Sequence, residues 1–460
     1  MKFNLSAIFI LAFIFISLGR NGEILIDLNP PDSSSSLIDK TAATYFIDEG
    51  KKMLNEGRTR EALAKFRQAY VKDQYNGKAA FWIGYTHYRL ANYGFALKYA
   101  RIAESLTEGE DGDVYLLLGE SYHRQNILDS AELNYNLALI HLRPARITAF
   151  NVQQKLNEVQ VAKNYANFNK QYNRNLVSGD LNSGYNDYAP FLNPINGDFY
   201  FVSRRPDTKG GGVNPDDQAY FEDIYVAKWN STTEGWDSIS NELGRLNTDG
   251  FDAISHLTSD GNRMYITLNT SVLDTKKPTR SSDICTADFN SKGTWNSAKP
   301  IKNKTINTSF FDGAATVTED ENTMYFVSDR KGEKSKSDIY VVERVGKNWG
   351  EAVPLPMHVN SIENETTPYI TPDGRFLFYS SDGLNGMGGY DIYVVEKKAN
   401  GEWGNPINLG PEFNSVNHDT HFKYFMNQSK GYMSSYQGQG DRASMDMYEI
   451  ILEGWSIPTE

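Results

Sequence analysis

The chain has 460 residues, a formal net charge of −12 and one cysteine, Cys285. A single cysteine excludes an internal disulfide framework and a cysteine-based zinc finger, and the acidic balance argues against a general nucleic-acid binder, which needs a cationic surface. The charge is uneven, because residues 1–174 carry 21 Lys and Arg against 18 Asp and Glu, whereas residues 175–460 carry 25 against 40. Two differently built regions therefore meet near residue 174.

Residues 1–19 have the features of a secretory signal peptide. Lys2 precedes an apolar run over residues 5–18, which is shorter than the about 20 residues of a membrane-spanning helix but suits the hydrophobic region of an export signal. We expect export to the periplasm and association with the outer membrane, and we leave open whether the segment is cleaved after Gly19 or kept as an anchor. Residues 20–40, rich in proline and serine, are expected to form a linker.

Residues 41–174 contain a repeat of about 34 residues. Glycine recurs at spacings of 34 and 35, alanines follow 12 and 19 positions after each glycine, and a further residue fills the space between the two alanines. The three sets are Gly50, Ala62, Phe66 and Ala69; Gly84, Ala96, Ala100 and Ala103; and Gly119, Ala131, Tyr135 and Ala138. Small residues at these positions let two antiparallel helices approach closely, and the pattern resembles the tetratricopeptide repeat.

The resemblance implies a helical array with a concave groove for a peptide or a partner helix. Tyr85, Tyr88, Tyr93 and Tyr122 are candidates for the groove, although we expect most of them to pack inside the array. Residues 145–170 continue as one long helical pattern, which we expect to cap the last apolar face of the array.

Residues 175–460 repeat with a different period, of 53 to 60 residues. Each unit contains an Asp-Ile-Tyr triplet or a close variant, preceded by an aromatic or β-branched run, and in the first four units a tryptophan follows 11 to 13 positions later. The triplets begin at Asp223, Asp283, Asp338, Asp391 and Asp446, and the tryptophans are Trp236, Trp295, Trp349 and Trp403. Short strands at even spacing predict a β-propeller. The direct count gives five blades, with a sixth, irregular blade as the alternative.

An asparagine is followed five positions later by an acid in every unit. The pairs are Asn182 and Asp187, Asn247 and Asp252, Asn307 and Asp312, Asn360 and Glu365, and Asn414 and Asp419. Because each acid falls just before the expected innermost strand, the five carboxyls are predicted to form a ring near the mouth of the central channel. The ring either satisfies backbone N–H groups of the loops between blades or binds a cation or a basic partner segment.

The propeller units resemble the WD40-like, TolB-type repeat, most clearly at residues 367–393. A tetratricopeptide array and such a propeller behind an export signal are similar to envelope proteins of the Bacteroidetes, some of which belong to the type IX secretion and gliding machinery. In that family an OmpA-like, peptidoglycan-binding domain often follows, but here the sequence stops at Glu460 and residues 18–20 lack a lipoprotein cysteine. We therefore do not expect peptidoglycan or acyl anchoring, and expect membrane association only through partners.

The resemblance implies a non-catalytic periplasmic scaffold that holds envelope proteins through its groove and its propeller face. The sequence contains no Gly-x-Ser-x-Gly elbow, phosphate-binding loop or separate catalytic domain, so we expect no enzymatic activity, cofactor or metal. On a strand, residues three apart point to opposite faces, and His418 and His421 are therefore not expected to share a metal. A carbohydrate-binding or glycan-cleaving propeller is the alternative function.

Residues 40–174 carry 19 basic against 14 acidic residues, which favours either distinct partners or docking of the two domains on each other.

Overall fold

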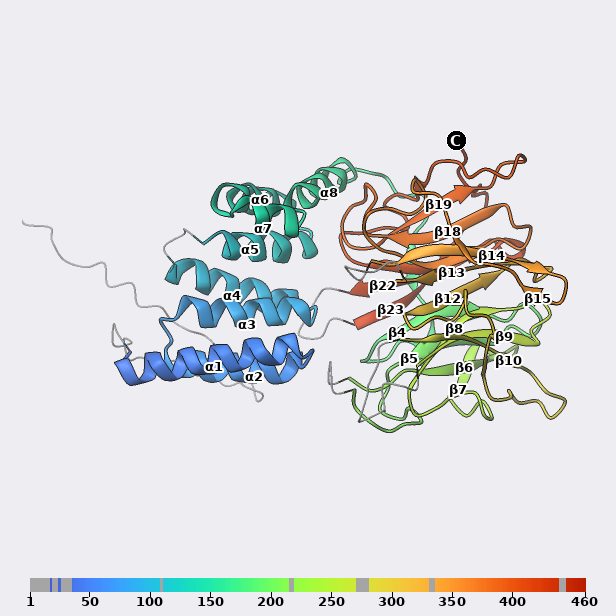
Figure 1. The fold of residues 1–460 in the computed structure, drawn as a ribbon, viewed down its shortest axis with the longest axis horizontal. Helices are drawn as coiled ribbons and strands as arrows, with labels where there is room; N and C mark the ends of the chain where they lie inside the picture. Colours follow the sequence, from blue (N-terminus) through green and yellow to red (C-terminus); the bar gives the residue numbers. More distant parts are fainter. Residues whose placement is uncertain are drawn as a thin grey trace, which may run out of the picture.

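The computed structural model describes residues 35–107, 111–214, 219–269, 281–330, 336–437 and 444–460, together with two paired strands, β1 (Ser17–Leu18) and β2 (Ile24–Leu25). Almost all of the predicted signal peptide and most of the predicted linker lie outside the described residues. A stack of helices leads into a five-bladed propeller that lies beside it (Figure 1). The predicted fold class, a tetratricopeptide α-solenoid followed by a β-propeller of five blades, is confirmed.

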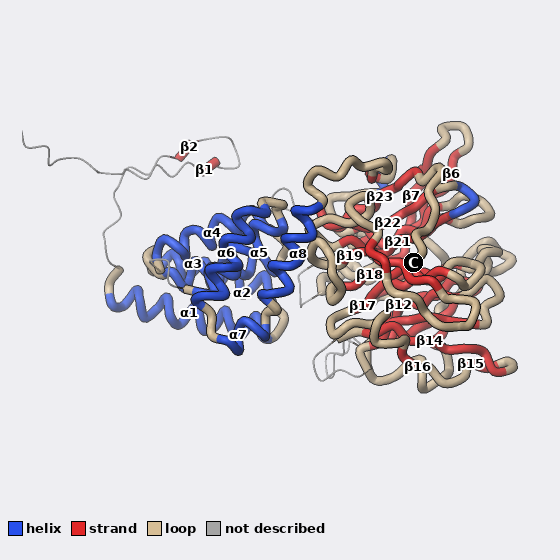
Figure 2. The backbone as a smooth tube through the Cα atoms, turned by 90° about the horizontal axis from the view of Figure 1, so that it is seen from above, coloured by secondary structure: helices blue, strands red, loops and turns tan. Residues whose placement is uncertain are grey.

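Three antiparallel helix pairs and two further helices form the array, and the pairs stack in chain order (Figures 1 and 2). The helices are α1 (Leu37–Asn55), α2 (Thr59–Lys72), α3 (Gly77–Arg89), α4 (Tyr93–Leu106), α5 (Gly112–Arg124), α6 (Leu128–His141), α7 (Pro144–Ala149) and α8 (Val152–Asn164). Side-chain caps begin the first helix of each pair, where the oxygens of Ser36, Asn76 and Asp111 accept backbone N–H groups. Among the described residues, none of the helices combines the length and the apolarity needed to cross a membrane.

The repeated glycines lie where the two helices of a pair touch. A Cβ added at Gly50 would lie 2.5 Å from the Phe66 ring, and one added at Gly119 would lie 2.6 Å from the Tyr135 ring. Phe66 and Tyr135 are both fully buried. The spacing of small and bulky residues in the sequence therefore corresponds to interlocking contacts between the paired helices.

The cap of the array differs from the expected single helix over residues 145–170. Asn151 adopts a left-handed conformation with φ of 47°, which interrupts the chain between α7 and α8. Asparagine tolerates this conformation better than most residues. The interruption lets α8 pack against α6 through the buried residues Leu156 and Val159, and the helix ends at Asn164.

Each blade is an antiparallel sheet whose strands follow one another from the centre outward. Blade 1 has β4 (Asp187–Leu192), β5 (Phe199–Ser203), β6 (Asp223–Asn230) and β7 (Gly235–Ser240), and blade 2 has β8 (Phe251–Leu257), β9 (Arg263–Asn269), β10 (Asp283–Asp288) and β11 (Lys299–Pro300). Blade 3 has β12 (Asp312–Val317), β13 (Thr323–Ser328), β14 (Asp338–Val345), β15 (Asn348–Trp349) and β16 (Val353–Pro354). Blade 4 has β17 (Glu365–Ile370), β18 (Phe376–Ser381), β19 (Asp391–Glu396) and β20 (Ile407–Asn408). The first strands of neighbouring blades contact one another all the way round the centre.

The fifth blade combines both ends of the propeller. Its strands are β21 (Asp419–Phe425), β22 (Lys430–Gln437), β23 (Ser444–Ile451) and β3 (Arg174–Leu176), and β3 pairs with β23. The outer strand of the last blade thus comes from the segment that directly follows the array. The predicted boundary between residues 174 and 175 falls inside this strand.

The repeated tryptophans pack against the preceding blade. Trp295 lies 6.2 Å from Tyr200 and Trp403 lies 5.8 Å from Tyr325, measured between ring centroids and at nearly perpendicular angles. Trp236 contacts Tyr432 in the same manner across the junction of blades 5 and 1. Edge-to-face contacts of this kind stabilise by about 0.5–1.5 kcal/mol each beyond the burial of area.

Replacing Gly119 with alanine tests the close helix contact. The added methyl group meets the buried Tyr135 ring, so we expect a loss of about 1–3 kcal/mol in the free energy of unfolding. The matched control is Gly94→Ala in α4, where a Cβ has nothing within 4 Å and should be neutral or stabilising. Thermal unfolding of the two variants is the measurement, and equal melting temperatures would contradict the packing argument.

Candidate functional site: the blade junctions and the channel

The asparagine of each repeated pair joins two neighbouring blades. The Asn247 side chain accepts the backbone N–H of Ile224 at 3.0 Å and donates to its carbonyl oxygen at 2.9 Å. Ile224 is the central residue of the Asp-Ile-Tyr triplet in the preceding blade. The same two-bond contact recurs at all five junctions, with Asn182 on Met447, Asn307 on Ile284, Asn360 on Ile339 and Asn414 on Ile392. We call these five residues the junction asparagines.

The five predicted ring carboxyls are fully buried at the start of the innermost strands. Each accepts the backbone N–H of the residue four positions earlier, at 2.6–2.9 Å. In four of them a Ser or Thr hydroxyl of that earlier residue donates to the same oxygen, as Thr308 does to Asp312. The sequence signal is therefore longer than the pair recognised above, since a Ser or Thr follows every junction asparagine.

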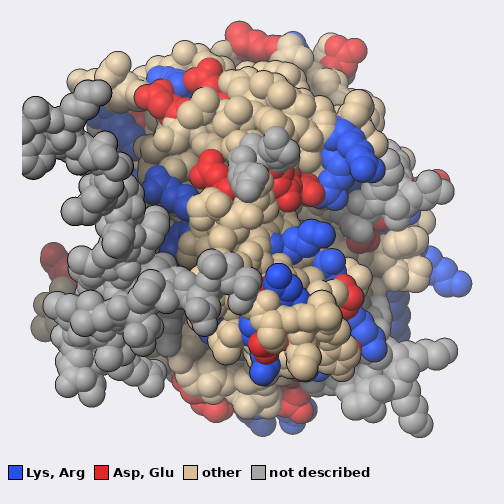
Figure 3. Space-filling view, turned by 90° about the vertical axis from the view of Figure 1, so that its left-hand side faces the viewer, with Lys and Arg blue, Asp and Glu red and all other residues tan. Residues whose placement is uncertain are grey.

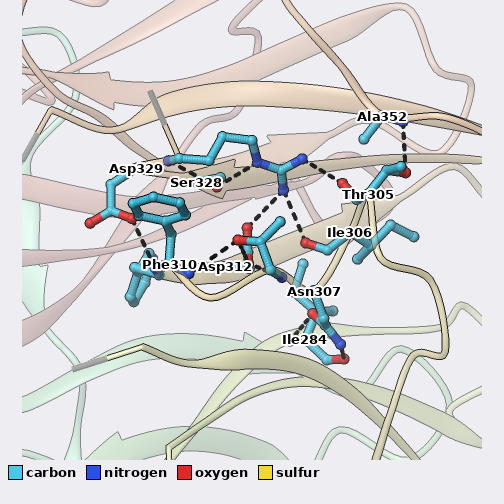
Figure 4. A network of polar contacts seen from close by, with 12 residues as sticks. Ile284, Thr305, Ile306, Asn307, Phe310, Asp312, Ser328, Asp329 and Ala352 are labelled. Atoms are coloured by element: carbon cyan, nitrogen blue, oxygen red, sulfur yellow. Dashed lines mark hydrogen bonds and ion pairs between the residues drawn. The ribbon is translucent and has the colours of Figure 1, made fainter. Parts of the chain in front are cut away.

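Arginine neutralises three of the ring carboxyls. Arg330 donates to Asp312 at 2.7 Å and to the carbonyl oxygen of Ile306 at 3.0 Å (Figure 4). Arg205 pairs with Asp187 at 3.2 Å, and Arg174 of β3 pairs with Asp419 at 2.7 Å. These arginines were not recognised in the sequence, although Arg205 and Arg330 both lie 18 positions after their carboxylate.

Asp252 and Glu365 have no arginine partner among the described residues. Burial raises the pKa of each carboxyl to about 7. The second carboxyl oxygen of Asp252 makes no hydrogen bond to any residue that the structure describes. The ring thus contains three carboxylates that are paired with arginine and two carboxyls whose pKa lies well above its ordinary value.

A cavity of about 400 Å³ lies in the channel beside the ring. None of the ring carboxyls lines it. The residues that follow them do, because the innermost strands of blades 1, 3, 4 and 5 contain a bulge with φ of 48–56° two positions after the carboxyl, at Ala189, Ala314, Thr367 and His421. That the ring binds a cation or a partner stays a prediction, and its buried contacts favour stabilisation of the blade junctions.

The bulge also changes where the two histidines point. His418 and His421 both line the channel cavity, because the left-handed residue at His421 breaks the strand alternation on which the opposite expectation was based. His418 accepts the backbone N–H of Tyr390 at 3.2 Å, and burial lowers the pKa of its ring to about 3. Over the described ranges, no group of three or more His, Cys, Asp or Glu side chains is arranged to hold a metal ion.

The array docks on one side of the propeller, as Figure 2 shows from above, and Tyr436 lines both the channel cavity and a cavity at this contact. A ring nitrogen of His123 lies 2.8 Å from the carbonyl oxygen of Met387, and Arg124 donates to the carbonyl oxygen of Val416 at 2.6 Å. Met387 and Val416 form a small apolar cluster with Ala162 of α8. Met387 belongs to the glycine-rich segment 382–389, which therefore holds the array. We call this contact the docking seam.

The face of the array carries both signs of charge. Lys, Arg, Asp and Glu side chains are interspersed on the end of the molecule in Figure 3. At the docking seam, Lys155 pairs with Glu120 at 2.9 Å, within the array itself. The net positive charge of residues 40–174 is therefore not gathered into one patch on the face shown.

The four groove candidates divide into two groups. Tyr93 and Tyr122 are buried and pack inside the array, whereas Tyr85 and Tyr88 are half-buried on α3. Tyr85 stacks against Phe81, one turn earlier, with ring centroids 6.1 Å apart. Phe81 and Tyr85 thus form an accessible aromatic pair on the first helix of the second pair.

Comparison with known proteins finds similarity at the level of the fold. No protein-family model matches the chain, and no curated protein does. Among solved structures, the first tetratricopeptide domain of Spaghetti, bound to an HSP90 peptide, has 18% identity and a TM-score of 0.25, covering 27% of this chain and 95% of that domain. TolB from Acinetobacter baumannii has 16% identity and a TM-score of 0.32 over 58% of this chain, which spans about half (54%) of TolB.

Enzymes are also among the similar structures. An α-L-arabinofuranosidase from Podospora anserina, in complex with cellotriose, has 12% identity and a TM-score of 0.39, covering 61% of this chain and 96% of the enzyme. An endo-arabinase, a second arabinofuranosidase and an N-acetylgalactosamine deacetylase match at 10–15% identity, with TM-scores of 0.34–0.35. At these values the likeness concerns the fold alone.

These matches correct one expectation. The sequence-based prediction that the chain is not an enzyme is wrong as argued, because it relied on the lack of a separate catalytic domain. The similar structures include four enzymes, matched over 92–96% of their own length.

Replacing Asp252 with asparagine tests the unpaired ring carboxyl. In the folded protein this carboxyl keeps its proton up to about pH 7, whereas in the unfolded chain it ionises near pH 4. The wild type therefore loses stability as the pH rises from about 4 to 7. Asp252→Asn removes this loss. At pH 8 we expect the free energy of unfolding of this variant to equal that of the wild type or to exceed it by about 1–3 kcal/mol.

The matched control is Asp187→Asn, which leaves the half-buried Arg205 without its carboxylate. We expect this variant to lose about 3 kcal/mol in its free energy of unfolding at pH 8. Urea unfolding of both variants at pH 5 and pH 8 is the measurement. Equal destabilisation of the two variants at pH 8 would show that arginine pairing does not distinguish the ring positions.

Proposed function

We propose that the chain is a protein-interaction module of the cell envelope, in which the array and the propeller hold different partners at a fixed spacing. The docking seam is the observation that carries this proposal. Its bonds from His123 and Arg124 are buried or partly buried, so the array is held against blades 4 and 5. Two binding surfaces fixed in this way raise the effective concentration of one partner for the other.

The array supplies the first surface. Phe81 and Tyr85 lie on α3, the first helix of the middle pair, whereas the array residues of the docking seam lie on α5 and α8. Half-buried aromatic rings of this kind anchor partner side chains with little loss of conformational entropy. The tetratricopeptide fold of Spaghetti is seen with a bound peptide, which agrees with a peptide or a helix as the partner here.

The location in the envelope is part of the same proposal. It is supported by the export-type N-terminal sequence and by the resemblance of the repeats to Bacteroidetes envelope proteins. We propose a periplasmic accessory of type IX secretion or gliding machinery, associated with the outer membrane through its partners.

Capture after crosslinking in intact cells tests the bivalent arrangement. We expect Phe81→Ala combined with Tyr85→Ala to lose one captured protein by at least about tenfold, the effect of removing two aromatic anchors, and to keep a second protein that binds the propeller. Ile140→Ala, an apolar truncation at an exposed position on α6, is the control and should keep both. Loss of both proteins in the aromatic variant, or of neither, would contradict two separate surfaces.

A second candidate is a carbohydrate-binding or glycan-cleaving propeller. It is favoured by the channel cavity, which has the carboxyl of Glu222 in its lining, and by the nearby Asp252, whose pKa Glu222 helps to raise. A pair of neighbouring carboxyls is the arrangement that glycosidases use.

An assay of the purified protein on arabinose-containing oligosaccharides and peptidoglycan fragments tests this candidate. If the propeller cleaves glycans, Glu222→Gln should lower turnover by about 100-fold or more, and Glu319→Gln, at an exposed position, should leave it unchanged. Wild-type protein without turnover would remove the cleaving form of this candidate.

A further inference from the structure

Lys423 is a buried lysine in the centre of the propeller. It belongs to β21, the innermost strand of blade 5, and its side chain lines the channel cavity with only 4% of its surface exposed. Over the described parts of the chain, its amine has neither a hydrogen bond nor a carboxylate within ion-pair distance. A buried ammonium without a partner is costly, and its retention needs a reason.

The surroundings of Lys423 contain little that could balance its charge. The amine lies 5.4 Å from the centre of the Phe191 ring, which gives only a weak attraction. His421 on the same strand and His256 on β8 are close enough for the lysine to help lower the pKa of both rings. Burial lowers the pKa of Lys423 itself to about 7. Glu222 lines the same cavity, but its carboxylate accepts a hydrogen bond from Tyr188.

The rest of the cavity offers neutral polar groups. Hydroxyls of Ser255, Thr366 and Thr420 lie in its lining, together with the neutral rings of His418 and His421. With a volume of about 400 Å³, the space accommodates a molecule the size of a sugar acid. The cavity holds one amine and also the Glu222 carboxylate, so it repels a ligand with a single negative charge less than a phosphate monoester, which carries about −1.5 to −2 at pH 7. This difference favours a monocarboxylate over a phosphate.

We propose that the channel cavity binds a small hydroxylated monocarboxylate, with its carboxylate on the amine of Lys423 and its hydroxyls on the polar lining. The bound carboxylate restores the partner that the amine lacks and makes the pair a charge-assisted hydrogen bond. This site is independent of partner binding by the array. It also differs from a site for neutral glycans, because the negative charge is the recognised feature.

Isothermal titration of the full chain tests the proposal, with glucuronate as the probe and methyl glucoside as its neutral counterpart. At pH 6 we expect saturable binding of glucuronate and none of methyl glucoside. At pH 8.5 the amine is largely uncharged, so binding should weaken by at least about tenfold. The histidines do not change charge in this range, but Asp252 and Glu365 ionise near pH 7. The double variant Asp252→Asn, Glu365→Gln should therefore keep the pH dependence if Lys423 causes it.

Lys423→Met, which keeps the length of the side chain and removes the charge, is the decisive variant. We expect it to lose glucuronate binding at pH 6 and to melt at the same temperature or higher, since it removes an unpaired buried charge. Lys430→Met, on the neighbouring strand with its lysine paired to Glu449, is the control and should bind as the wild type does. Unchanged binding in Lys423→Met, equal binding of methyl glucoside, preference for inorganic phosphate, or no binding of glucuronate would each overturn the proposal.

Discussion

The two-bond contact between a junction asparagine and the backbone of the preceding blade is the interaction on which the propeller depends. Each blade alone would leave the N–H and C=O of its triplet isoleucine or methionine without partners at the junction, and buried backbone groups of this kind must be paired. A side-chain amide supplies a donor and an acceptor at once, so one asparagine completes one junction. The repetition of this contact closes the circle of five blades and fixes the position of the innermost strands.

The ring carboxyls are a consequence of that geometry. A carboxyl placed after the junction turn can accept the turn's N–H and hydroxyl groups, but it becomes buried in doing so. An arginine then offsets the cost at Asp187, Asp312 and Asp419, whereas Asp252 and Glu365 take up a proton more readily. The innermost strands bulge directly after the ring, and this bulge opens the channel cavity and directs His421 into it.

The fold was predictable because its repeats are regular in sequence. The spacing of Gly50, Gly84 and Gly119 reflects helix contacts, and the Asp-Ile-Tyr triplets mark strands. These periods, together with the resemblance to known repeats, predicted both architectures, and the count of triplets predicted five blades. The shape of the channel was harder to predict from the sequence, because it depends on bulges that a strand pattern does not reveal. His421 illustrates this, since alternation pointed it away from His418. The break at Asn151 and the role of Lys423 likewise depend on contacts between segments that are far apart in the chain.

The closing strand β3 has a consequence for how the two parts of the molecule communicate. Arg174 lies in that strand and also neutralises Asp419 of the innermost strand, and α8 of the array ends only ten positions earlier, at Asn164. Tension that a bound partner applies to the array would therefore reach the closure of the propeller, where β3 pairs with β23. We expect such tension, where it travels along the chain, to load first this closure of the propeller, which consists of three residues of strand and one arginine.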